Sequence, residues 1–291
     1  MMQWRYFTAA VAILCLSSAC QRQPQPPATP QATDTAPAKP AVPLAEPPYN
    51  RETLLLATLR AASNAALGRP DVDWQRTLDG KPFELKLRFG CGEGNGDAQA
   101  QGWTFDAKRR VLSLRVRPGI TGSDAMIDAL GLEGYEAAEG FWIRRPWLLA
   151  AACPAPPTPR PAAAGPSPIA QASAAPNAHA SAAPAAEPSP TPIIPRIGLA
   201  QFFTKTDART IRHGKRAYEA TKILPDGTSP SMEGYNLVIT GRLRSLNDGS
   251  VIACVNRGTD APPDCIISAQ VDTVAIQRPD SGEAIATWSK G

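Results

Sequence analysis

Residues 154–195 read PAPPTPRPAAAGPSPIAQASAAPNAHASAAPAAEPSPTPIIP, and this tract decides how the chain is divided. Thirteen of the 31 prolines lie in it, whereas it holds no aromatic residue and only two charged residues. Such a composition buries too little apolar surface to offset the entropy lost on ordering the backbone. The tract therefore predicts a disordered linker between two folded segments, residues 49–153 and 196–291.

The start of the chain has the pattern of an export signal. Arg5 precedes an apolar run, residues 6–16, which is too short to span a hydrocarbon core of about 30 Å. The junction Leu16-Ser17-Ser18-Ala19-Cys20 resembles the lipobox of bacterial lipoproteins, with the leucine four places before the cysteine instead of three. The resemblance implies that residues 1–19 are removed as a signal peptide and that Cys20 receives a lipid. Ordinary cleavage that leaves Cys20 free is the alternative.

A second proline-rich tract follows the signal. Residues 20–48 contain nine prolines, which is typical of a stalk that holds a folded part away from an anchored terminus. Gln21, rather than an acidic residue, follows the cysteine. The resemblance to lipoproteins therefore implies a periplasmic protein anchored to the outer membrane by its lipid. A soluble periplasmic or secreted protein is the alternative.

The remaining cysteines favour disulfides. Cys91, Cys153, Cys254 and Cys265 form an even set in an oxidising compartment, and four cysteines allow three connectivities. One bridge within each segment is the simplest pairing. A zinc site is the less favoured alternative because no C-x-x-C spacing occurs. We expect no metal ion and no other cofactor.

The first folded segment combines helices with antiparallel strands. Apolar residues recur at three- and four-residue steps over 51–67 after the capping residue Asn50, and they alternate with charged residues over 83–89. Further on, the pattern predicts a β-hairpin over 103–106 and 111–117, a short helix over 124–130 capped by Ser123, and a brief strand over 141–143. The segment is expected to be an α+β domain.

The second folded segment is mainly β. Apart from a helical turn or two over 206–211, its patterns predict strands at 216–223, 235–243, 250–255, 264–276 and 283–288, with a bulge near Asp272. With no helix to cover a sheet face, it would form a barrel- or sandwich-like antiparallel domain. We favour two separate domains. In the alternative, the first segment covers this sheet and the two form one composite module.

Two stretches of the first segment have competing interpretations. The glycine-rich run 90–97 follows a strand, but it lacks the third glycine of a dinucleotide-binding turn and the distal glutamate of an EF-hand calcium loop. A solvated hairpin loop fits it better. Trp142 and Trp147 flank Arg144 and Arg145, which could stack sugars or peptides, although core aromatics beside a disulfide are the more common arrangement.

Charge is nearly balanced in both segments. Residues 49–153 carry 14 Lys and Arg against 13 Asp and Glu, and residues 196–291 carry 12 against 10, which excludes the strong basic excess of nucleic-acid-binding proteins. The densest basic cluster is a candidate site for an anionic ligand such as an envelope glycan or a lipid head group. Its members are Arg209, Arg212, His213, Lys215 and Arg216.

No catalytic motif is present. The chain lacks G-x-S-x-G, S-x-x-K and H-E-x-x-H, and His213 is the only histidine outside the tract. We assign no catalytic residue. The sequence favours a non-catalytic envelope lipoprotein that acts as a scaffold or binding module for a protein or cell-envelope glycan partner. The alternative is a cell-wall or carbohydrate-active hydrolase with two carboxylates about 5 to 10 Å apart.

Overall fold

A computed structural model of the chain describes residues 46–92, 101–155 and 195–289. The signal peptide, the lipidation site Cys20, almost all of the predicted stalk, most of the linker and most of the glycine-rich run lie outside these residues. Glu46–Gly291 forms one compact unit. Within the described part of the chain, no helix is both long and apolar enough to cross a bilayer.

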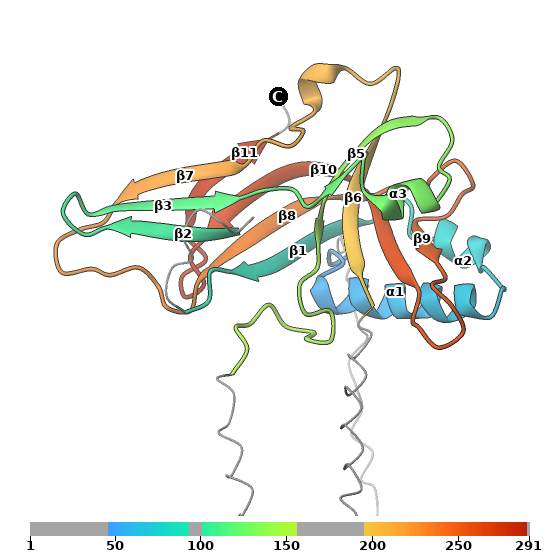
Figure 1. Cartoon of the computed structure of the whole chain (residues 1–291), viewed down its shortest axis with the longest axis horizontal. Coiled ribbons are helices and arrows are strands. Elements are labelled where there is room, and N and C mark those ends of the chain that lie inside the picture. The colour runs from blue at the N-terminus through green and yellow to red at the C-terminus, as the bar shows by residue number, and fades with distance from the viewer. Residues whose placement is uncertain (1–45, 93–100, 156–194, 290–291) are drawn as a thin grey trace, which may run out of the picture. The chain divides into compact units, whose positions relative to one another are not determined.

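Helix α1, Arg51–Ala66, begins where the sequence predicts. Asn50 Oδ1 accepts a hydrogen bond from the Thr53 N–H at 3.0 Å, and Thr53 Oγ1 accepts one from the Asn50 N–H at 2.8 Å. This reciprocal pair satisfies two donors that a helix leaves free at its start. The buried face of α1 includes Leu54, Leu55 and Ala61 and packs against strands of the larger sheet (Figure 1).

The larger sheet is organised around the long strand β10, Asp264–Gln277. The first half of β10 pairs with β6 and β9, and the second half pairs with β8 and β11. The pairing with β8 shifts between Val271 and Thr273, which confirms the bulge predicted near Asp272. The other strands of this sheet are β1 Pro82–Phe89, β4 Ile120–Thr121, β5 Tyr135–Trp142, β6 Ile197–Thr204, β8 Tyr235–Leu243, β9 Ile252–Val255 and β11 Ala284–Ser289.

The smaller sheet has the order β2-β3-β7, with bounds Gln101–Asp106, Val111–Val116 and Tyr218–Ile223. β2 and β3 form the predicted hairpin. Among the described strands only β6 and β10 pair in parallel, so the sheets are mostly antiparallel. Both sheets are open, so the barrel, one of the two arrangements expected for the second segment, does not form. The short helices are α2 Val72–Arg76, α3 Ala125–Ala129 and η1 Arg209–Ile211.

The two folded segments are one module, so our preference for separate domains at 49–153 and 196–291 is corrected. Three strand pairs join residues from opposite sides of the tract: β1 with β8, β5 with β6, and β3 with β7. α1 also covers strands of the second segment. The second segment needs no helix of its own because the first segment supplies that cover.

Several local predictions need smaller corrections. The N-cap of α3 is Asp124, whose carboxylate accepts the Met126 N–H at 2.9 Å, and not Ser123. β5 begins at Tyr135, well before the strand predicted at 141–143. β4, β6 and α2 were not predicted.

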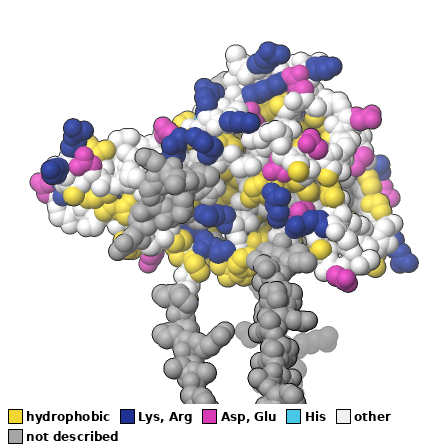
Figure 2. All heavy atoms as spheres, in the orientation of Figure 1, with side chains coloured by type: hydrophobic (Ala, Val, Ile, Leu, Met, Phe, Trp, Pro, Cys, Tyr) yellow, Lys and Arg dark blue, Asp and Glu magenta, His cyan; other side chains and the backbone are white. Residues whose placement is uncertain are grey.

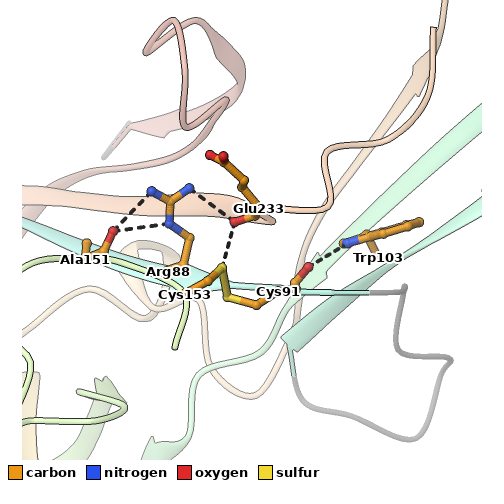
Figure 3. Close-up of a disulfide and its surroundings, with 7 residues drawn as sticks. Arg88, Cys91, Trp103, Ala151, Cys153 and Glu233 are labelled. Atoms are coloured by element: carbon orange, nitrogen blue, oxygen red, sulfur yellow. Dashed lines mark hydrogen bonds between the residues drawn. A yellow bond between two sulfur atoms is a disulfide. The ribbon is translucent and has the colours of Figure 1, made fainter. Parts of the chain in front are cut away.

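Both disulfides have the predicted pairing. Cys254 and Cys265 face each other across β9 and β10, and Cys91 bonds Cys153. Figure 3 shows the Cys91–Cys153 bridge beside Arg88, whose guanidinium donates to the carbonyls of Ala151 and Glu233. The chain end leading into the tract is thus held to the end of β1. By the loop-entropy model, closing this long loop stabilises the fold by about 4 kcal/mol at most.

Candidate functional site

A pocket of about 220 Å³ lies where the two segments meet. Its lining comes from β5 and the chain just before β4 in the first segment, and from β6, η1, the loop after η1, the start of β7, the β10 bulge and β11 in the second. The residues used below are Glu139, Arg212, His213, Arg216, Tyr218, Asp272 and Trp288. A groove between packed segments is a common position for ligand sites.

One wall of the pocket is aromatic. The His213 ring stacks on Tyr218 with centroids 3.8 Å apart and an interplanar angle of 9°. Tyr218 in turn makes a T-shaped contact with Trp288, with ring centroids 5.2 Å apart. These three rings come from a loop and two strands, and together they offer an apolar surface with polar edges.

Glu139 fixes the loop that holds His213. Its carboxylate accepts the His213 N–H at 2.9 Å and the Gly214 N–H at 2.7 Å, one on each oxygen. Gly214 has a φ of +71°, a conformation that glycine adopts without steric cost. Both oxygens of Glu139 therefore hold the backbone of this loop in place.

Two buried nitrogen atoms beside the pocket have no hydrogen-bond partner among the described residues. They are Arg212 Nε and His213 Nε2; Arg115 Nε and Asn236 Oδ1 are in the same condition elsewhere. The other end of the Arg212 guanidinium is engaged with Glu136 and the carbonyls of Thr204 and Asp207. A buried donor without an acceptor costs about 1–3 kcal/mol. Both atoms are closed to solvent, so an oxygen-bearing group would have to enter between these side chains and their neighbours to remove that cost.

Arg216 adds a positive charge at the pocket. It is exposed, and its guanidinium donates to the carbonyls of His213 at 3.0 Å and Arg212 at 3.3 Å. These bonds hold the side chain against the loop. With Arg212 it provides two cations, while the carboxylates that line the pocket are Glu139 and the exposed Asp272.

The phenol of Tyr218, which lines the pocket, has a shifted pKa that can be measured. Burial raises the pKa of Tyr218 from its usual 10 to about 12, and Glu139 contributes in the same direction against Arg216. Because the folded-state pKa is the higher one, the neutral phenol stabilises the fold fully below pH 10, and this stabilisation is lost as the pH rises towards about 12. We expect tyrosinate absorbance to show a group that ionises near pH 12 and is missing in Tyr218→Phe. An identical titration curve for the variant would contradict this assignment.

The structure brings together part of the basic cluster predicted from the sequence. Arg212, His213 and Arg216 line the pocket, whereas Arg209 and Lys215 are exposed and do not. Figure 2 shows Lys and Arg side chains gathered at the top of the unit, where η1 and the following loop lie in Figure 1. Glu139, Tyr218 and Trp288 were not predicted. The only sequence signal for them was their place relative to predicted strands: Tyr218 lies within one, Trp288 ends another and Glu139 precedes a third.

The predicted tryptophan platform has a different arrangement. Trp142 is partly buried beneath Arg196, whose guanidinium carbon lies 4.0 Å from the ring centroid. Trp147 is exposed on the loop that follows β5. Arg144 and Arg145 stack on neither ring among the cation–π contacts of the described residues.

Comparison of the chain with protein-family models, curated protein sequences and solved structures finds no match. Within residues 46–92, 101–155 and 195–289, no three His, Cys, Asp or Glu side chains gather as metal ligands would. The chemistry of the pocket is therefore argued from its own residues.

Proposed function

We propose that this protein is a non-catalytic binding module of the cell envelope, held to the outer membrane by a lipid on Cys20, and that its pocket binds an anionic group of an envelope partner. One observation supports this most: Arg212 and His213 place buried, unpartnered nitrogen atoms at a pocket that Arg216 also lines. Carboxylate or phosphate oxygens would accept a hydrogen bond from the Arg212 Nε–H, and one from His213 Nε2 in the form of the ring that carries a proton there.

The size and walls of the pocket narrow the ligand class. About 220 Å³ holds a small group rather than a whole polymer, so the ligand would be one unit of a larger partner. The rings of Tyr218 and Trp288 suit the apolar face of a sugar, and the arginines suit a carboxylate. Peptidoglycan fragments combine both features and are the first probe to use.

The hydrogen bonds that Glu139 accepts favour binding over hydrolysis. Two carboxylates, Glu139 and Asp272, line the pocket, which is the arrangement that a carbohydrate hydrolase would need. However, both oxygens of Glu139 accept main-chain N–H groups, so this carboxylate is poorly placed to exchange a proton with a substrate. Release of sugar fragments by the wild-type protein but not by Asp272→Asn would favour the hydrolase instead.

The test compares two neighbouring charge removals. Arg216→Gln removes a cation that lines the pocket, and we expect about tenfold weaker binding of soluble peptidoglycan fragments in calorimetry. Lys215→Gln removes the adjacent exposed cation, which does not line the pocket, and should change the affinity less than twofold. Cross-linked pull-downs from envelopes should show the same difference. Equal losses in both variants, or no binding by the wild-type protein in either assay, would contradict the proposal.

A further inference from the structure

Exposed apolar side chains concentrate on one side of the unit. Seven large hydrophobic residues are exposed within the described part of the chain, and five of them lie on α1, at its C-cap or on the loop after β5. These five are Leu56 (51% exposed), Leu59 (52%), Leu67 (65%), Trp147 (59%) and Leu149 (44%).

The three leucines share the outer side of α1 and its C-cap with the exposed Glu52 and Ser63, and we call this side the outer stripe. At 100° per residue, Leu56, Leu59 and Leu67 project within about 80° of one another. The buried residues Leu54 and Ala61 project on the opposite side of the helix. Because the sheet-facing side already buries its own apolar residues, the outer stripe is not needed to attach α1 to the fold.

The loop that bears Trp147 and Leu149 is fixed to the start of this helix. The buried Arg51 donates to the carbonyls of Arg144 at 2.9 Å, Arg145 at 3.0 Å and Leu148 at 2.9 Å. The loop and α1 lie along the same lower side of the unit in Figure 1. Figure 2 shows hydrophobic side chains along this lower edge, with Lys and Arg side chains just above them.

The same region concentrates positive charge. Arg51, Arg88, Arg144 and Arg145 lie around one small hollow. Burial lowers the pKa of Arg145, and repulsion from Arg144 and Arg88 lowers it further. The guanidinium groups of Arg51 and Arg88 donate hydrogen bonds to backbone carbonyls. None of the four arginines forms a salt bridge with a described carboxylate. An external anion would offset this repulsion.

We propose that the outer stripe of α1 and the loop 144–149 dock on a membrane surface rich in anionic phospholipids. The leucines and Trp147 enter the boundary between head groups and acyl chains, and Arg144 and Arg145 pair with lipid phosphates. Exposed leucine, an interfacial tryptophan and adjacent arginines are the combination that interfacial helices use. The charge excess favours anionic lipid over a neutral apolar partner.

The place where the chain enters the described unit agrees with docking on a membrane. Residues before Glu46 join the unit five positions ahead of α1, so a lipid on Cys20 would be linked to the fold through the chain that leads into this helix. The docking proposal itself goes beyond the pocket and does not depend on the pocket's ligand. It also does not require the lipid, because the helix and loop would supply their own affinity.

Vesicle co-sedimentation of the lipid-free protein tests the proposal. The protein would comprise residues 20–291 with Cys20→Ser, mixed with phosphatidylglycerol-containing or pure phosphatidylcholine vesicles. We expect binding to the anionic vesicles that weakens with salt, and about tenfold weaker partitioning for Leu56→Gln/Leu59→Gln and for Arg144→Gln/Arg145→Gln. Ile223→Gln is the matched control, since Ile223 is 72% exposed but lies on β7.

Other results of the vesicle experiment would overturn the docking proposal. Absence of binding to either vesicle, or an equal loss in Ile223→Gln, would overturn the proposal. A wild-type dimer that the leucine variant converts to a monomer, without an effect on vesicles, would identify this face as a contact between two copies and would also overturn it. Arg216→Gln should bind vesicles normally, so that a failure of the pocket proposal is distinguished from a failure of this one.

Discussion

A chain that consists only of residues 196–291 is expected to be unfolded in solution. Without the first segment, β8 loses its pairing with β1, β6 loses β5, and β7 loses β3. The cover provided by α1 is lost as well. The buried face of β8, including Leu237 and Ile239, would then be exposed to water, and conformational entropy would outweigh the remaining contacts. Urea unfolding followed by circular dichroism should show no cooperative transition.

Adding the first segment as a separate chain provides the control. Co-expression of residues 46–155 with residues 196–291 should yield a one-to-one complex that unfolds cooperatively, because the strand pairs between the segments do not require a covalent tract. A sharp unfolding transition for residues 196–291 alone would show that the second segment is a domain in its own right. It would contradict the composite module.

Strands with one solvent-exposed face were predictable from the sequence. In β1, Phe83, Leu85 and Leu87 are buried while the charged residues between them are not, and the alternating pattern shows this directly. In β10 the change of parity near Asp272 indicated the bulge that the structure contains. Period-two alternation is a local signal, so it needs no knowledge of the partner strand.

Of the strands that join the two segments, β6 was the hardest to recognise. In β6, Ile197, Gly198, Leu199 and Ala200 are all buried, so the strand has no polar face to alternate with. It pairs with β10 in parallel and with β5 on its other edge. Strands inside such a sheet have near-continuous apolar runs, which short periodicity rules do not separate from other buried segments. β6 supplies one of the three strand pairs that join the two segments.

The candidate site was predictable only where its residues are neighbours in the sequence. Arg212, His213 and Arg216 stand close together and were recognised as a basic cluster. Glu139 and Trp288 reach the same pocket through β5 and β11, and their positions depend on how β5 pairs with β6 across the tract and how β11 pairs with β10. Composition contains no information on such pairings. The anionic-ligand hypothesis therefore located one wall of the pocket and missed the others.

Gly140→Ala is expected to have the largest effect of any single methyl addition that we propose. A Cβ at Gly140 would lie 2.2 Å from the Leu199 carbonyl oxygen and 2.7 Å from Ala200 Cα, both backbone atoms of β6. β5 and β6 would have to separate, which breaks a pairing between the segments and deforms the pocket that Gly140 lines. We expect the free energy of unfolding to fall by more than about 4 kcal/mol, measured by urea titration.

Gly122→Ala is the matched control for this substitution because it adds the same methyl group near the same strand. Its Cβ would meet Ala137 Cα at 3.5 Å, an ordinary contact, and its backbone is not in the left-handed region. We expect a change within about 1 kcal/mol. If both variants lost similar stability, the close approach of β5 to β6 would not be the cause. If Gly140→Ala were as stable as the wild-type protein, the two segments could not be joined along these strands as the structure has them.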